Sequence, residues 1–182
     1  MVILVDFWSK RPYNTSMNNK KAGKDMMTKE DFYHDFLLLR DMKIPTPRKS
    51  RMLGELLSSH PDNWRVVGIT RDALIKFKEH DFFRESRMGI NRSHIVDRNK
   101  TFKTMLEGPL MDCDTWWKFY VDNDRTILST SSENLSKKEG AQSTVYKIDE
   151  SIGLFKSRGF SWIHNLAETE FLRYTYAKRI RK

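Results

Sequence analysis

Cysteine is nearly absent from this sequence, and several familiar functional signatures are missing too. The single cysteine, Cys113, allows no disulfide framework, and no cysteine and histidine residues have the spacing of a structural zinc site. The stretch MVILVDFWSKRPYN (1–14) includes Asp6 and no long apolar run, which predicts neither a signal peptide nor a membrane span. Residues 153–160 (GLFKSRGF) lack the spacing of a glycine-rich phosphate loop. These absences favour a self-supporting core in a reducing compartment, so we expect a cytoplasmic location without membrane association.

What the sequence does contain is a strong excess of positive charge on a globular composition. Its 182 residues suit one domain, and 38% hydrophobic and 12% aromatic residues can build a sizeable core. The formal net charge is +9. An excess of this size favours a polyanionic partner, although a basic protein without such a partner is the plainer alternative.

Helix and strand signals are mixed along the chain without regular alternation. Helices are expected from Thr28 to the stop at Pro45 and Pro47, over 50–60, after Thr70, from Asp114, over 131–140 and over 167–182. Strands are expected over 2–8, 64–69, 93–98, 125–130 and 143–148. Residues 10–24 contain five Lys or Arg and no acid, which is typical of a mobile basic loop. The pattern predicts an α+β fold.

One histidine stands out because polar residues suited to phosphodiester hydrolysis follow it. His94 lies in INRSHIVDRNKTF (90–102), and VDNDRTILSTSSENLSKKEG (121–140) follows it. Hydrolysis needs an activated water and a cation on the phosphate oxygens. A neutral imidazole accepts a proton near pH 7, and Asn or Asp oxygens suit Mg²⁺. A strand with His, a second strand and a helix with Asn would bring base and metal ligand to one phosphate.

These residues resemble the motif of the HNH (ββα-metal) nucleases over roughly 90–140. The resemblance makes His94 the general base, Asn123 the middle asparagine that orients the base, and Asn134 the metal ligand. It implies a ββα-metal core within a mixed helical and strand domain. Ser93 stands at the metal-ligand position where the family usually has Asp, and the segment from His94 to Asn123 is longer than in compact members. Taken singly, His94 is an ordinary strand residue and both asparagines are local turn or backbone partners.

The stretch NRSH (91–94) also resembles the Asp-Arg-Gly-His motif of the nonspecific DNA/RNA endonucleases, which contain the same unit. On that pattern Arg92 assists with the phosphate and Asn123 replaces Asn134 as the metal ligand. Glu133 would then hold a metal-bound water. The two ligand assignments stay open, and Asp97 or Asp122 is a further source of a carboxylate.

The sequence therefore predicts a Mg²⁺-dependent (or Mn²⁺-dependent) endonuclease that hydrolyses double-stranded DNA. Residues 1–89 would form a basic DNA-binding extension, 90–140 the catalytic unit, and 141–182 a strand and basic helix packed on the same globular domain. Sequence specificity of the restriction or homing type is expected from the size of the extension. The basic side chains expected to bind DNA are Lys20, Lys21, Arg84, Arg87, Arg98, Lys137, Lys138, Arg179 and Arg181.

The alternative is a DNA-binding protein on a degenerate HNH scaffold that cleaves nothing, which Ser93 favours. RNA is a weaker candidate, because the aromatic motifs of common RNA-binding modules are missing from the sequence. A double-strand cutter with one site per chain is often a dimer, so a homodimer is among the expectations.

Overall fold

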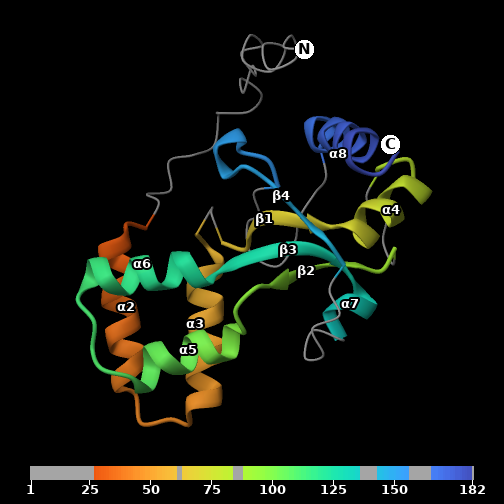
Figure 1. The fold of residues 1–182 in the computed structure, drawn as a ribbon. Coiled ribbons are helices and arrows are strands. Elements are labelled where there is room, and N and C mark those ends of the chain that lie inside the picture. Colours follow the sequence, from red (N-terminus) through yellow and green to blue (C-terminus); the bar gives the residue numbers. More distant parts are fainter. Residues whose placement is uncertain (1–26, 61–62, 84–87, 136–142, 156–164, 182) are drawn as a thin grey trace.

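The computed structural model describes residues 27–60, 63–83, 88–135, 143–155 and 165–181, which form an α+β fold. A four-stranded sheet adjoins a bundle of four helices (Figure 1). The helices are α2 (Lys29–Asp41), α3 (Thr46–Ser58), α4 (Arg71–Glu79), α5 (Arg98–Glu107), α6 (Cys113–Asn123), α7 (Ser131–Leu135) and α8 (Leu166–Arg179), with a 3₁₀ turn η2 (Glu150–Ile152). The strands are β1 (Arg65–Thr70), β2 (Ile90–His94), β3 (Arg125–Thr130) and β4 (Val145–Lys147). No described helix is long and apolar enough to cross a membrane.

The sheet has the strand order β2-β3-β1-β4 and is mixed in direction. The central strands β1 and β3 are parallel, whereas β2 and β4 are antiparallel to their neighbours. In the β2–β3 pair, Ile90 lies opposite Thr130 and His94 lies opposite Thr126. The last residue of β2 therefore lies beside the beginning of β3.

Helices α4 and α8 pack with the sheet around the first apolar core. Val66 and Ile69 from β1 and Leu128 from β3 pack with Phe77 of α4 and Leu172 of α8. Thr70 begins α4, because its side chain accepts a hydrogen bond from the backbone N–H of Ala73, at the third position of the helix. In Figure 1, α4 and α8 lie together at one end of the sheet, and the bundle lies at the other.

Helices α2, α3, α5 and α6 form the bundle around a second apolar core. α2 packs on α3 and α6, and α5 packs on the same two helices. The core is largely aromatic, and the Phe36 and Trp116 rings stack with their centroids 4.8 Å apart. A capping box of Thr28 and Asp31 begins α2, as the sequence predicted.

Most of the described elements confirm their sequence predictions, but several boundaries differ. Pro45 and Pro47 belong to the start of the second helix. Pro45 is the N-cap of α3 and Pro47 lies in its first turn, where a missing N–H costs nothing. The strand expected at 93–98 ends at His94. The helix expected from Asp114 has Asp112 as its cap.

The largest difference is the segment between His94 and Asn123, where the sequence predicts a single helix, from Asp114. It holds two helices, α5 and α6, which pack with α2 and α3. The described residues within 90–140 therefore contribute to both parts of the molecule, as do those within 1–89. The expected strand at 2–8 and basic loop at 10–24 lie outside the described residues.

Candidate functional site

His94 and Asp124 meet where the β2–β3 pair joins the bundle. His94 is the last residue of β2, and Asp124 links the end of α6 to the start of β3. The antiparallel register therefore brings the two residues together, and His94 Nε2 lies 3.1 Å from Asp124 Oδ1. The side chains are 12% and 5% exposed, respectively. The pair is thus largely shielded, with part of the imidazole still reached by water.

Asp124 is the centre of a hydrogen-bond network that holds the junction together. Its Oδ2 accepts hydrogen bonds from the Trp64 backbone N–H at 2.7 Å and from the Tyr120 hydroxyl at 3.1 Å. Arg98 Nε lies 3.6 Å from Oδ1. Burial, followed by the negative charge of Asp124, raises the pKa of the Tyr120 phenol far above its usual value. Tyr120 therefore keeps its proton and acts as a donor to the carboxylate.

Trp64 and Arg98 enclose the histidine and the carboxylate with flat groups. The Trp64 ring meets the His94 ring edge to face, with centroids 4.4 Å apart. The Arg98 guanidinium carbon lies 5.1 Å from the Trp64 ring centre and 4.8 Å from that of Phe102. Trp64 has a positive φ of 59°, a region that non-glycine residues rarely occupy. Its carbonyl accepts hydrogen bonds from Arg92 Nη1 and Thr126 Oγ1, both at 3.1 Å, which help to hold this backbone conformation.

The His94–Asp124 contact determines which imidazole nitrogen can act as a base. An ionised carboxylate only accepts hydrogen bonds, so Nε2 carries the proton in this contact. The neutral ring then has its lone pair on Nδ1. A carboxylate behind a histidine fixes the tautomer and stabilises the imidazolium formed when the ring takes up a proton. The pair is therefore chemically suited to general-base catalysis.

Asn123 lies at the same end of the strand pair as His94. It occupies the last position of α6, directly before Asp124, and its Nδ2 donates to the Phe119 carbonyl at 2.7 Å. This bond leaves the amide oxygen as its acceptor group. Asn123 is therefore the predicted metal ligand that lies at the same end of the strand pair as His94.

Asn134 and Ser93 are not brought to His94. Asn134 is an exposed residue of α7, which begins after the last residue of β3, and the Ser131 N–H donates to the Gly89 carbonyl at 2.8 Å. His94 lies at the opposite end of the same strand pair. Ser93 points to the other face of the sheet, where its Oγ lies 2.5 Å from Ser129 Oγ. An aspartate at position 93 would point away from His94 as well.

Arg92 and Glu133 have partners that bind parts of the fold together. Arg92 shares a sheet face with His94, but it is buried and donates to the Trp64 carbonyl. Glu133 is buried too, and it accepts hydrogen bonds from Thr70 Oγ1 at 2.7 Å and from the Ser143 N–H at 3.2 Å. Burial opposes the charge on Glu133, but its hydrogen bonds prevail and lower its pKa. Glu133 thus ties α7 to β1 and to the segment before β4.

The two further carboxylates considered as metal ligands, Asp97 and Asp122, are exposed and already interact with other groups. Asp97 caps α5 by accepting from the Asn99 N–H at 2.8 Å. Asp122 pairs with Lys118 at 2.6 Å and with Arg125 at 3.5 Å. Within the described part of the chain, no group of three or more His, Cys, Asp or Glu side chains is placed to hold a metal ion.

The basic residues predicted to bind DNA are separated by the fold. Arg98 lies inside the His94–Asp124 network, whereas Arg179 and Arg181 are exposed at the end of α8. The predicted contacts Lys20, Lys21, Arg84, Arg87, Lys137 and Lys138 lie outside the described residues.

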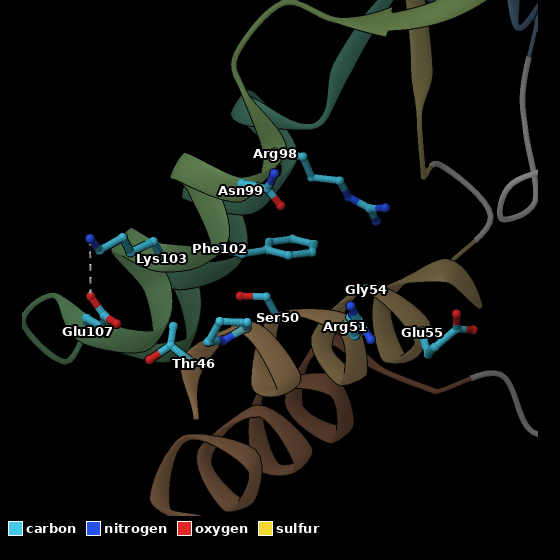
Figure 2. Close-up of a pocket in the computed structure, with 11 residues that line it drawn as sticks. Thr46, Ser50, Arg51, Gly54, Glu55, Arg98, Asn99, Phe102, Lys103 and Glu107 are labelled. Carbon is cyan, nitrogen blue, oxygen red and sulfur yellow. Dashed lines mark ion pairs between the residues drawn. The ribbon is translucent and has the colours of Figure 1, made fainter. Parts of the chain in front are cut away.

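A groove between α3 and α5, hereafter the α3–α5 groove, begins beside Arg98 (Figure 2). Its volume is about 750 Å³, and Arg51 and Lys103 lie among its lining residues. The sequence prediction of DNA contacts did not include these two residues, although Arg51 closes the basic stretch Arg48-Lys49-Ser50-Arg51. The sequence prediction also left out Asp124, because Asp-Asn-Asp is typical of a turn. The one signal for Asp124 is its position directly before the predicted strand 125–130, next to the strand that contains His94.

No family model matches the chain, and no curated protein or solved structure matches it.

Proposed function

We propose that this protein is a metal-dependent endonuclease in which His94 is the general base. The observation that carries the proposal is the His94–Asp124 pair, with Nε2 3.1 Å from the carboxylate oxygen. A proton on Nε2 in this contact leaves the lone pair on Nδ1. It is supported by the order of residues that resembles the HNH nucleases and by the net charge of +9, which favours a nucleic-acid substrate.

The residues around the pair have distinct roles in this proposal. His94 Nδ1 takes a proton from the attacking water, and Asp124 stabilises the positive charge that the ring acquires. Arg98, held between Trp64 and Phe102, contributes a fixed positive charge near the phosphate. A Mg²⁺ or Mn²⁺ ion bound through Asn123 would supply a positive charge for the phosphate oxygens.

The geometry favours Asn123 over Asn134 as the ligand in this proposal. Asn123 and His94 lie at the same end of the β2–β3 pair, and α7 carries Asn134 at the other end. This corresponds to the nonspecific-endonuclease pattern, with one difference. Arg98 takes the place expected for Arg92, because Arg98 contacts Asp124 directly while Arg92 is bound to the Trp64 carbonyl.

The test is cleavage of supercoiled plasmid DNA by the purified full chain, with Mg²⁺, with Mn²⁺ and with EDTA. We expect metal-dependent nicking or linearisation that is lost in His94→Ala and Asn123→Ala and retained in Asn134→Ala. Circular dichroism and thermal melting of each variant show whether the fold survives. A folded wild-type protein that cuts with neither ion, or a folded His94→Ala variant that still cuts, overturns the proposal.

A second candidate is a nucleic-acid-binding protein that does not cleave. The engagement of Asp124 by four groups favours it, because such a network also explains His94 as a residue that fastens β2 to the bundle. This candidate predicts a salt-sensitive gel shift that is the same with EDTA and with Mg²⁺, and no cutting under either condition.

A further inference from the structure

The bundle has its positive charge concentrated on two of its four helices. α3 and α5 each contain three basic residues and one acidic residue. α2 has four acidic residues against two basic ones, and α6 has two against one. A binding surface for a polyanion on the bundle would therefore lie on α3 and α5.

The packing order places these two pairs of helices on opposite sides. α3 packs on α2 and α5, and α6 packs on the same two helices, so the α3–α5 pair lies opposite the α2–α6 pair. The α3–α5 groove thus opens on the basic side, and the acidic helices lie behind it.

The groove contains Gly54 where its two helices approach, and its charged lining residues are Arg51, Arg98 and Lys103 against Glu55 and Glu107. Gly54 lies where α3 approaches α5, since a Cβ added there would lie 3.5 Å from the Phe102 ring. Arg51 is exposed on α3 and Lys103 on α5, and both line the groove (Figure 2). Arg98 extends from the His94–Asp124 pair to the Gly54 end, where its Nη1 would be 4.0 Å from that added Cβ. One side chain therefore connects the groove with the candidate catalytic pair.

We infer that the α3–α5 groove binds a single strand of nucleic acid through its phosphates. A cavity of about 750 Å³ has the dimensions of a small-ligand pocket, which suits one strand better than a duplex. Arg51 and Lys103 would contact successive phosphates, and Arg98 would direct the strand toward His94. This inference rests on the proposed function in taking nucleic acid as the polyanion, and it makes single-stranded or locally opened nucleic acid the substrate.

The test measures binding in EDTA, so that it does not depend on cleavage. The probe is a fluorescein-labelled oligothymidylate of about 20 nucleotides, longer than ordinary single-strand sites, and binding is followed by fluorescence anisotropy. We expect Arg51→Glu combined with Lys103→Glu to weaken binding at least about tenfold and to reduce the slope of log affinity against log salt by about 1 to 2.

The chain offers a matched control on the acidic side of the bundle. Lys118 of α6 and Lys103 of α5 are 77% and 71% exposed, and each pairs with an acid four residues later. Lys103→Glu and Lys118→Glu therefore make the same change in net charge and in local helix pairing. We expect only Lys103→Glu to weaken binding, and equal losses from both variants overturn the groove assignment.

The outcomes separate this inference from the proposed function. Metal-dependent plasmid cutting with oligonucleotide binding unchanged in the double variant would keep the nuclease and refute the groove. Groove-dependent binding without cutting would keep the groove and refute the nuclease. Tighter binding of a duplex of the same length would refute the single-strand assignment, whereas comparable binding of oligouridylate supports recognition through phosphates.

Discussion

The sheet half and the helical bundle bury very different interiors. The described bundle helices enclose aromatic and aliphatic side chains, with Thr101 as their buried polar residue. The sheet half and its junction with the bundle bury the carboxylates of Asp124, Glu133 and Glu168, each with hydrogen-bond donors. Buried charges are costly unless they are paired, so these networks fix local geometry. The bundle instead carries its charge on the surface, divided between two sides.

Removing an aromatic ring from the interior of the bundle should cause the largest loss of stability. Phe36 is 1% exposed and stacks on Trp116. Phe36→Ala should cost about 3–5 kcal/mol of unfolding free energy, because it leaves a cavity in a close-packed core. Urea unfolding measures this loss. Leu38→Ala on the same helix is the control, since Leu38 is exposed and its truncation should change stability little.

The second prediction concerns the charged network at the junction. Asp124→Ala leaves the Trp64 N–H, the Tyr120 hydroxyl and the Arg98 guanidinium without their shared acceptor. We expect a loss of about 3 kcal/mol in urea unfolding, and with it any cleavage. The neighbouring Asp122→Ala removes an exposed carboxylate and should have little effect on stability. Equal stability of the two variants would contradict a structural role for the Asp124 network.

The third prediction separates two buried carboxylates of the sheet half by their pH dependence. Burial raises the pKa of Glu168, although N–H groups of Asn165 and Phe155 oppose this effect. Between the unfolded-state pKa of 4.5 and the raised pKa of the folded state, Glu168 keeps its proton in the native state and loses it in the unfolded state. The free energy of unfolding contributed by this group therefore falls as the pH rises through that window.

Glu168→Gln should remove this decline, which urea unfolding from about pH 4 to about pH 7 would show. Glu133 provides the opposite case, because its pKa is lowered. The stability that ionised Glu133 contributes is present above pH 4.5, the pKa of the unfolded state, and is lost as the pH falls through the lowered pKa of the folded state. Glu133→Gln should therefore flatten the acid side of the profile. Parallel profiles for wild type and both variants would show that neither carboxylate is perturbed by folding.

The sequence predicts elements of both parts of the molecule, but it does not predict one helix of the bundle. Local signals such as the Thr28 cap and the β-branched run of β3 are sufficient to place elements, and the structure confirms them. α5 was not expected, because its apolar residues are spread among Lys, Asn and Thr, and its buried side is defined by packing on α3 and α6. Propensity alone cannot supply that tertiary contact.

The candidate site was predictable in its histidine and only partly in its partners. His94 and Asn123 lie at one end of the strand pair, whereas Asn134 lies at the other because α7 starts where β3 ends. Asp124 contacts Trp64, which is 60 residues away in the sequence, through a backbone bend at positive φ. Such a contact depends on how the chain closes between β1 and the bundle, and no local pattern encodes it.

The smallest expected effect comes from replacing the buried glycine of α3. Gly54 lies inside α3, and a Cβ there would make an ordinary contact of 3.5 Å with Phe102. Gly54→Ala should therefore raise stability by up to about 1 kcal/mol, because alanine loses less backbone freedom on forming a helix. Thermal or urea unfolding measures the gain. Gly68→Ala in β1 is the comparison from the sheet half, where the added carbon would lie 2.9 Å from a Val145 methyl group and should be destabilising. A stabilised Gly54→Ala variant that binds oligothymidylate more weakly would indicate that the glycine keeps the groove open at a cost in helix stability.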